Sequence, residues 1–206
     1  WGAQAEFAFL DPAYSLSVPM QQVISGAFDT LSHAMETYFG KPDENNLSDD
    51  TNEAAMRSVI RNSRILLTDP ENYDARSELA QASAMAENGV LKTGKVTDFQ
   101  AHQIEHQLGA YTDCNHGASL AVIHPVLYRH IYKSGTARFT RWAQNVWASR
   151  PRAVTGRPRL PVSTRWPRSL RKSICRPALQ SLAFPPTPTS APWRILPTSP
   201  LAAAKS

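Results

Sequence analysis

A change of composition near residue 150 restricts most strongly how this chain can fold. Residues 1–149 contain 11 Lys and Arg and all 17 Asp and Glu, a formal net charge of −6. Residues 150–206 contain 11 Lys and Arg and no acid, a net charge of +11, together with 11 of the 16 prolines. The overall charge of +5 therefore reflects the tail, and we expect the folded domain within residues 1–149.

The Arg/Pro-rich tail, residues 150–206, follows neither a helical nor a strand period. A basic, Pro-rich segment is typical of a disordered arm that binds nucleic acid. An abrupt loss of acids with a gain of Arg and Pro is also typical of a GC-rich gene translated in the wrong frame. We expect the second origin, which predicts an unstructured or out-of-frame tail and does not favour nucleic acid as a partner. A truncated, frame-shifted product without activity is then an alternative reading of the whole chain.

Apolar residues recur with a helical period through most of residues 20–149, which predicts a mainly α fold. Strand-like sequence is confined to the first twenty residues, where Glu6–Leu10 is predicted as a short buried strand. Asp98 is expected to cap the helix that carries His102 and His106. The predicted helices number about six: approximately residues 21–38, 51–67 and 73–91, the helix that carries His102 and His106, and residues 117–132 and 137–147. Tyr111–Asn115 is predicted as a turn.

Cysteine content and hydropathy indicate the compartment. Cys114 and Cys175 are the only cysteines and lie in compositionally different segments, which argues against a disulfide framework and fits a reducing cytoplasm. No apolar run approaches the ~20 residues of a membrane span, and no signal peptide follows Trp1. We therefore expect a cytoplasmic protein without a membrane partner. Because the chain does not begin with Met, we also expect a fragment.

Four of the six histidines form a pattern with one aspartate. Asp29 and His33 are four residues apart on one predicted helix, and His102 and His106 have the same spacing on another, so each pair shares a helical face. His116 opens the following helix. Nitrogen and oxygen ligands converging from three helices are typical of a catalytic divalent metal site. On spacing alone, histidines satisfied within the core or at the surface remain the alternative.

These segments resemble a known enzyme family. The segment GAFDTLSHAMETY resembles the GxxDxxxHxxExY segment of the iron-containing (group III) alcohol dehydrogenases, and HQIEHQLGAYTDCNHGASLAVIHP resembles that family's second metal segment. The phrases FAFLDPAYSLSVP and PENYDAR are similar to the butanol dehydrogenase branch, which includes NADPH-dependent aldehyde reductases. A dehydroquinate synthase-like lyase is the alternative within the superfamily, and the Asp29/His33 pair argues against it.

The resemblance implies a metal site and the chemistry performed there. Its metal ligands fall on Asp29, His33, His106 and His116, and His102 receives a catalytic proton-relay role. The implied cofactors are a divalent metal, Fe²⁺ or Zn²⁺, and NAD(P)H. The implied reaction interconverts a primary alcohol and an aldehyde, with the metal acting as a Lewis acid on the substrate oxygen. The partners are therefore a small aldehyde or alcohol, and the family also admits a homodimer.

The resemblance further implies a domain organisation. Residues 20–149 correspond to an incomplete helical metal-binding domain of the dehydroquinate synthase-like/iron-alcohol-dehydrogenase fold, and residues 1–19 to a remnant of the edge of the cofactor domain. The glycines are scattered and form no Gly-rich phosphate-binding turn, so we expect no cofactor cradle in this chain. Glu36 is expected to support Asp29 or His33 without binding the metal.

Overall fold

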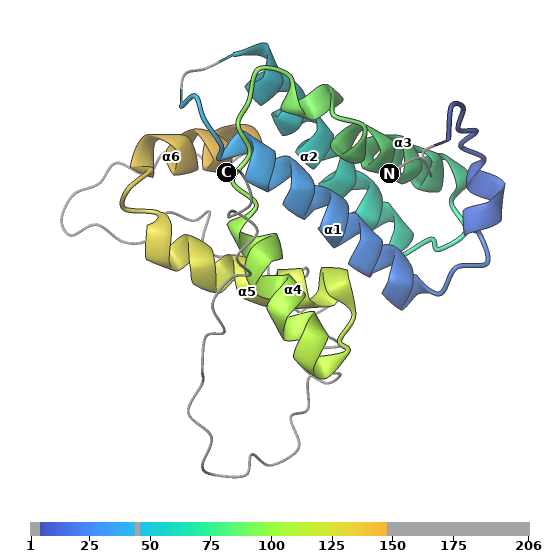
Figure 1. The fold of residues 1–206 in the computed structure, drawn as a ribbon. Helices are drawn as coiled ribbons and strands as arrows, with labels where there is room; N and C mark the ends of the chain where they lie inside the picture. The colour runs from blue at the N-terminus through green and yellow to red at the C-terminus, as the bar shows by residue number, and fades with distance from the viewer. Residues whose placement is uncertain (1–4, 44–45, 148–206) are drawn as a thin grey trace, which may run out of the picture.

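A computed structural model describes residues 5–43 and 46–147 of the chain. The predictions made for residues 150–206 lie outside these described residues, as does the start of the predicted 1–19 segment. The predicted mainly α fold is confirmed, since no β-strand occurs in the described part of the chain. Its helices, shown in Figure 1, are α1 (Met20–Tyr38), α2 (Leu47–Leu66), α3 (Tyr73–Glu87), α4 (Gln100–Thr112), α5 (His116–Ile131) and α6 (Thr136–Asn145), with short 3₁₀ turns η1 (Pro12–Ser15) and η2 (Val90–Lys92).

Capping residues decide where the helices begin. α2 begins at Leu47 rather than near residue 51, because the Asn46 side chain accepts from the Asp49 N–H and the Asp49 side chain accepts from the Asn46 N–H. Asn72 caps α3 in a similar way through the N–H of Ala75. The polar residues that precede these helices thus belong to their first turns.

The predicted buried strand at Glu6–Leu10 is wrong. The segment has no regular secondary structure and pairs with no neighbour in the described residues, and Phe7 and Phe9 are 80% and 97% exposed. An apolar run becomes a strand only when another strand accepts its hydrogen bonds. The local sequence favours a strand, but no second strand lies beside it in the described residues.

Helix α1 lies at the centre of the bundle and contacts α2, α3 and α5, while α4 packs on α5 (Figure 1). Its buried face supplies fully covered side chains such as Met35 and Tyr38. Phe39, just after α1, packs against the rings of Phe139 and Trp142, which attaches α6 to the core. Because α1 contacts helices on both sides, side chains along it can meet groups from both α3 and α4–α5.

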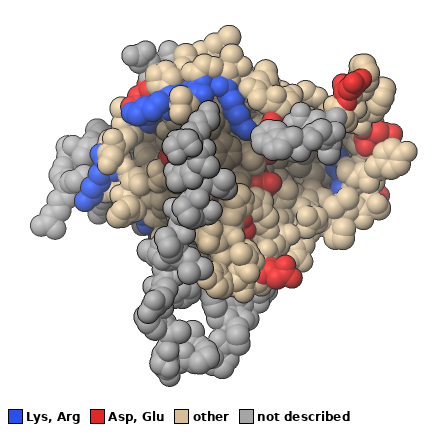
Figure 2. Space-filling view, viewed as in Figure 1, with Lys and Arg blue, Asp and Glu red and all other residues tan. Residues whose placement is uncertain are grey.

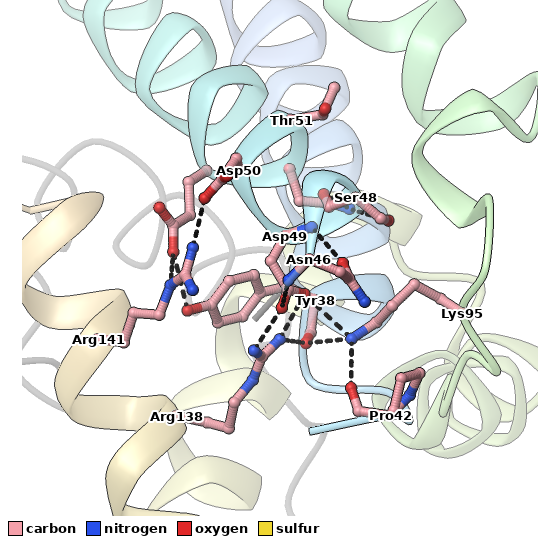
Figure 3. A network of polar contacts seen from close by, with 12 residues as sticks. Tyr38, Pro42, Asn46, Ser48, Asp49, Asp50, Thr51, Lys95, Arg138 and Arg141 are labelled. Carbon is pink, nitrogen blue, oxygen red and sulfur yellow. Dashed lines mark hydrogen bonds and ion pairs between the residues drawn. The ribbon is translucent and has the colours of Figure 1, made fainter. Parts of the chain in front are cut away.

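A buried ionic cluster joins the end of α1 to α2 and α6 (Figure 3). The Asp49 carboxylate is fully buried and accepts from Arg138 at 2.6 Å and from Lys95 at 3.1 Å. Arg138 also donates to the carbonyl oxygen of Tyr38 and lies over the Tyr38 ring. Next to this cluster, Arg141 pairs with Glu53 at 2.6 Å. Two cations on one buried carboxylate therefore hold α6 and the Lys95 loop against the start of α2.

The surface view indicates how charge is distributed on one face. Basic side chains gather in a band toward the upper left of Figure 2, and acidic side chains lie apart from one another. Most of the visible, described surface on this face is uncharged. Among the described helices, none combines the length and apolar character needed to cross a bilayer.

Candidate metal centre

Asp29 and His33 lie on one face of α1, as their spacing predicts. The His33 Nε2 atom is 3.6 Å from Asp29 Oδ1. Asp29 Oδ1 is buried and makes no hydrogen bond with the described residues. A buried carboxylate oxygen without a partner is costly unless a cation or donor reaches it.

Two further imidazoles reach the same oxygen from α4 and α5. His102 Nε2 is 3.4 Å from Asp29 Oδ1, and His116 Nε2 is 3.3 Å from it. His102 Nε2 also lies 3.2 Å from His33 Nε2. Four ligand atoms placed tetrahedrally at about 2.1 Å from an ion would be about 3.4 Å apart. The four separations, 3.2–3.6 Å, are close to this distance.

His106 lies beside this centre rather than within it. Its ring stacks on the His116 ring at a centroid distance of 5.7 Å and stands 6.2 Å from the His102 ring. Among the described residues, two groups bring three possible ligand atoms within 4.8 Å of one another: Asp29, His102 and His116, and separately Glu105, His106 and His116. The structure therefore brings His102 to Asp29 and places His106 with Glu105.

The position of α4 explains why His102 is the closer histidine. The predicted Asp98 cap is wrong: the N-cap residue is Phe99, at a positive φ of 52°, and no side chain within the helix caps it. Instead the Glu36 carboxylate of α1 accepts from the N–H of Ala101 at 2.5 Å and of His102 at 3.3 Å. The first turn of α4 is thereby held against α1, and the next turn, which carries His106, is further away.

Carboxylates lie behind two of the histidines. Glu36 hydrogen-bonds with His102 Nδ1, and Glu105 with His116 Nδ1. The expectation that Glu36 supports Asp29 or His33 is thus replaced by a contact with His102. Glu105 carried no sequence signal of its own, because its position relative to His116 depends on the turn between α4 and α5.

Glu87 at the end of α3 is a further site residue that sequence reasoning missed. Its Oε1 atom is 2.8 Å from His33 Nε2, and its side chain is 53% exposed. No motif marks this glutamate, since it is far in sequence from the other site residues and meets them only through the packing of α3 on α1.

The titration of these groups follows from burial and from their mutual charges. Burial and the neighbouring charge of His102 lower the pKa of His33 to about 4. Burial alone would lower the pKa of His102, but the carboxylates of Asp29 and Glu36 raise it to about 9. Burial acts to raise the pKa of Asp29, yet the three neighbouring histidines lower it below its usual range. The ionised Asp29 and the neutral His33 suit a cation, whereas His102, with its raised pKa, must lose a proton before it can bind one.

Comparison with known proteins decides the family. The sequence model of the Fe-containing alcohol dehydrogenase family, C-terminal part, matches residues 23–156. The chain belongs to this family. The matched residues include every member of the candidate metal centre described above.

Individual relatives are also similar to the chain in sequence. The chain is 38% identical over 143 residues to NADH-dependent butanol dehydrogenase B of Clostridium acetobutylicum, covering 69% of this chain and 37% of the relative. It is 32% identical over 144 residues to the NADPH-dependent aldehyde reductase YqhD of Escherichia coli, covering 70% of this chain and 37% of the relative. The chain therefore spans little more than a third of the length of these curated relatives.

Solved structures in the family share the fold. A butanol dehydrogenase A from Thermotoga maritima superposes with a TM-score of 0.66 at 26% identity, covering 83% of this chain and 39% of that one. The substrate- and cofactor-free form of YqhD from Escherichia coli superposes with a TM-score of 0.68 at 28% identity, covering 88% and 45%. The helical bundle is therefore the C-terminal helical fold of iron-containing alcohol dehydrogenases, as the sequence predicts.

Proposed function

We propose that this chain is the metal-binding part of an oxidoreductase that interconverts a primary alcohol and an aldehyde with NAD(P)(H), similar to the butanol dehydrogenases. The observation that carries the proposal is the convergence of three imidazole Nε2 atoms on the buried Asp29 Oδ1, at 3.3–3.6 Å. The proposed ligands are Asp29, His33, His102 and His116. His102 thus takes the ligand place predicted for His106, and its predicted proton-relay role gives way to metal binding.

The residues present fit a divalent cation. One carboxylate and three imidazoles leave the centre with a net positive charge when an ion is bound, and this donor set suits Fe²⁺ and Zn²⁺ alike. A bound ion would supply Lewis-acid polarisation of the substrate oxygen, and a nicotinamide would supply the hydride. The names of the relatives include both NADH- and NADPH-dependent enzymes, so both nicotinamides belong in the test.

The protein side of the mechanism consists of holding and orienting these ligands. Asp29 provides the only negative charge among the four ligands, and the imidazoles meet it from α1, α4 and α5. Glu87 occupies the same ring nitrogen of His33 that an ion requires. It must therefore leave His33 Nε2, or turn toward the ion, when the ion binds.

Two measurements test this function. Equilibrium dialysis of the 206-residue chain against Zn²⁺ should give one ion per chain, and Asp29→Asn should abolish binding at the same free zinc. The second measurement uses a protein in which this chain is joined to a nicotinamide-binding domain. This protein should reduce butanal with consumption of NADH or NADPH, and Asp29→Asn should abolish the reduction. Zinc binding without aldehyde reduction would leave a metal site of another activity, and absence of zinc and iron binding would overturn the proposal.

The proposed domain organisation remains that of the sequence analysis: residues 20–149 as the metal-binding domain, and residues 1–19 as an edge toward a cofactor domain. A homodimer and a cytoplasmic location are likewise proposals, supported by the family relationship. Sedimentation of the purified chain over a range of concentrations tests the dimer.

A further inference from the structure

Two buried carboxylates stand behind the proposed metal ligands in the same relative position. Glu36 contacts Nδ1 of His102, and Glu105 contacts Nδ1 of His116. Both glutamate side chains are only 3% exposed. In each histidine the opposite ring nitrogen, Nε2, faces Asp29 Oδ1. Thus each of the two imidazole rings lies between a glutamate at Nδ1 and the shared Asp29 Oδ1 at Nε2.

The chemistry of the imidazole ring gives this order a consequence. An ionised carboxylate can only accept hydrogen bonds, so the ring nitrogen beside it must carry the proton. In a neutral imidazole with its proton on Nδ1, the lone pair is on Nε2. A carboxylate at Nδ1 therefore selects the ring form that presents Nε2 to an ion, fixes the ring's direction and makes the nitrogen a stronger donor.

We propose that Glu36 and Glu105 are positioning residues, which hold His102 and His116 with the proton on Nδ1 and with both Nε2 atoms directed at the ion. The proposal rests on the proposed function, because it assumes that the centre at Asp29 binds a metal. Glu36 is well anchored for this role, since it also accepts the backbone N–H groups of Ala101 and His102. Its one carboxylate both places α4 and orients the ligand in the first turn of α4.

Gly109, one turn further along α4, provides space for the Glu105 carboxylate. A Cβ atom added to Gly109 would lie 3.3 Å from Glu105 Oε1, so the glycine leaves room for the carboxylate. Glu105 also groups with His106 and His116 as possible ligands. Its Oε2 meets the His116 nitrogen that points away from Asp29, however, so a single ion cannot use both sides. A second ion at Glu105 would compete with the proposed hydrogen bond and would appear as a second equivalent of bound metal.

His33 provides a comparison within the same site. Its Nδ1 atom is buried and has no hydrogen-bond partner in the described residues, and its Nε2 atom meets Glu87. By the same rule Glu87 favours the proton on Nε2 of His33, the nitrogen that an ion needs, and no carboxylate of the described residues contacts its Nδ1. The proposal therefore applies to His102 and His116 and not to His33.

The direct test is ¹⁵N NMR of the histidine rings in the full chain, recorded without metal and with Zn²⁺. We expect Nδ1 to carry a proton in His102 and His116 in both states, and Zn²⁺ to bind through Nε2. An unprotonated Nδ1, or zinc bound through Nδ1, in either ring would overturn the proposal. The metal-free spectrum, recorded at a pH high enough for both rings to be neutral, tests the ring forms even if the chain binds no zinc, so failure of the proposed function and failure of this inference are separable.

Zinc affinity, measured by competition with a chromogenic chelator, tests the consequence. Glu105→Gln keeps an acceptor oxygen but loses the charge, whereas Glu105→Ala loses both. Both variants should bind zinc roughly 10–100-fold more weakly, and Glu105→Ala should be the weaker of the two. Glu36→Gln should lower it similarly, provided that circular dichroism shows the helical fold retained. Glu78→Gln is the control. Glu78 lies on α3, where its exposed side chain contacts Ser58 and Arg61 of α2, and the variant should bind zinc as tightly as the unaltered chain. Affinities unchanged in both Glu105 variants, or two zinc ions per chain, would contradict the positioning role.

Discussion

Gly117, at the start of α5, lies directly against the backbone of Ser25 in α1. A Cβ atom added to Gly117 would lie 2.1 Å from the carbonyl oxygen of Ser25, a separation that no side chain tolerates. The contact brings α1 and α5 together one residue after His116. Because Gly117 has no side chain, His116 Nε2 can come within 3.3 Å of Asp29 Oδ1. A glycine outside the ligand set thus controls the geometry of the centre.

Gly117→Ala should therefore destabilise the protein and weaken metal binding. We expect the free energy of unfolding in urea to fall by about 1–3 kcal/mol, the usual cost of overpacking a tight contact. Zinc affinity should fall as well, because α5 must move away from Asp29. Gly26→Ala is the matched control on α1: no atom lies within 4 Å of the added Cβ, so this change should stabilise the helix by roughly 0.5–1 kcal/mol. Equal effects of the two substitutions would show that the α1–α5 contact is not limiting.

His102→Gln and His106→Gln should differ sharply in zinc affinity. Removal of the ligand His102 should cost more than about 100-fold, since residues that only support a ligand cost roughly 10–100-fold. His106→Gln should cost less than tenfold, about 1.4 kcal/mol, because His106 stacks on the His116 ring and is not in the group of ligand atoms around Asp29. Isothermal titration with Zn²⁺ measures both. The reverse order would return His106 to the ligand set that the family resemblance implies.

Glu87→Gln should leave zinc affinity unchanged or raise it a few-fold. In the metal-free protein the carboxylate holds the His33 nitrogen that an ion needs, and its charge-assisted bond competes with the ion. The amide of glutamine makes a weaker bond and competes less. A fall of about tenfold or more would instead identify Glu87 as a metal ligand. The absorption spectrum of the Co²⁺-loaded protein distinguishes the two, because loss of a ligand changes the coordination number.

Arg138→Met should strongly destabilise the bundle. The substitution leaves the buried Asp49 carboxylate with Lys95 as its remaining cation and removes the donor to the Tyr38 carbonyl. Removal of one partner of a buried ion pair costs about 3–5 kcal/mol, and urea unfolding should show a loss near the lower end. The exposed pair of Arg61 with Glu78, at 3.7 Å, is the control: Arg61→Met should change stability by less than about 1 kcal/mol. A small effect at Arg138 would mean that the cluster in Figure 3 does not hold α6.

The same cluster should make stability depend on acid pH. Burial alone would raise the pKa of Asp49, but the hydrogen bonds from Arg138 and Lys95 lower it below its ordinary value of 3.8. Because the folded protein binds this proton less readily than the unfolded chain, the contribution is complete above about pH 4 and is lost as the pH falls through the lowered pKa. Urea unfolding between about pH 2 and 5 should show a smaller fall toward acid in Asp49→Asn than in the unaltered chain. Parallel curves would exclude Asp49 as a source of the acid sensitivity.

The sequence was sufficient where the relevant contacts are local. Asp29 and His33 share a face because a helix repeats every 3.6 residues, and this spacing needs no knowledge of the rest of the fold. The caps at Asn46 and Asn72 are likewise local patterns in the sequence. The prediction overlooked the Asn46 cap and therefore began α2 near residue 51 rather than at Leu47. The Glu6–Leu10 prediction failed because a strand depends on a partner that local preference cannot supply.

The helical periodicity and the change in composition near residue 150 belong to the sequence by itself, and so do the mainly α fold and the family. The choice between His102 and His106 was made only by the tertiary structure. Both histidines lie on the same face of α4, so their spacing is equally compatible with either as the ligand. Glu36 holds the first turn of α4 against α1, and Gly117 lets α5 approach Ser25. These contacts between residues distant in sequence set the positions of the helices, and the positions of the helices decide which nitrogen atoms meet Asp29.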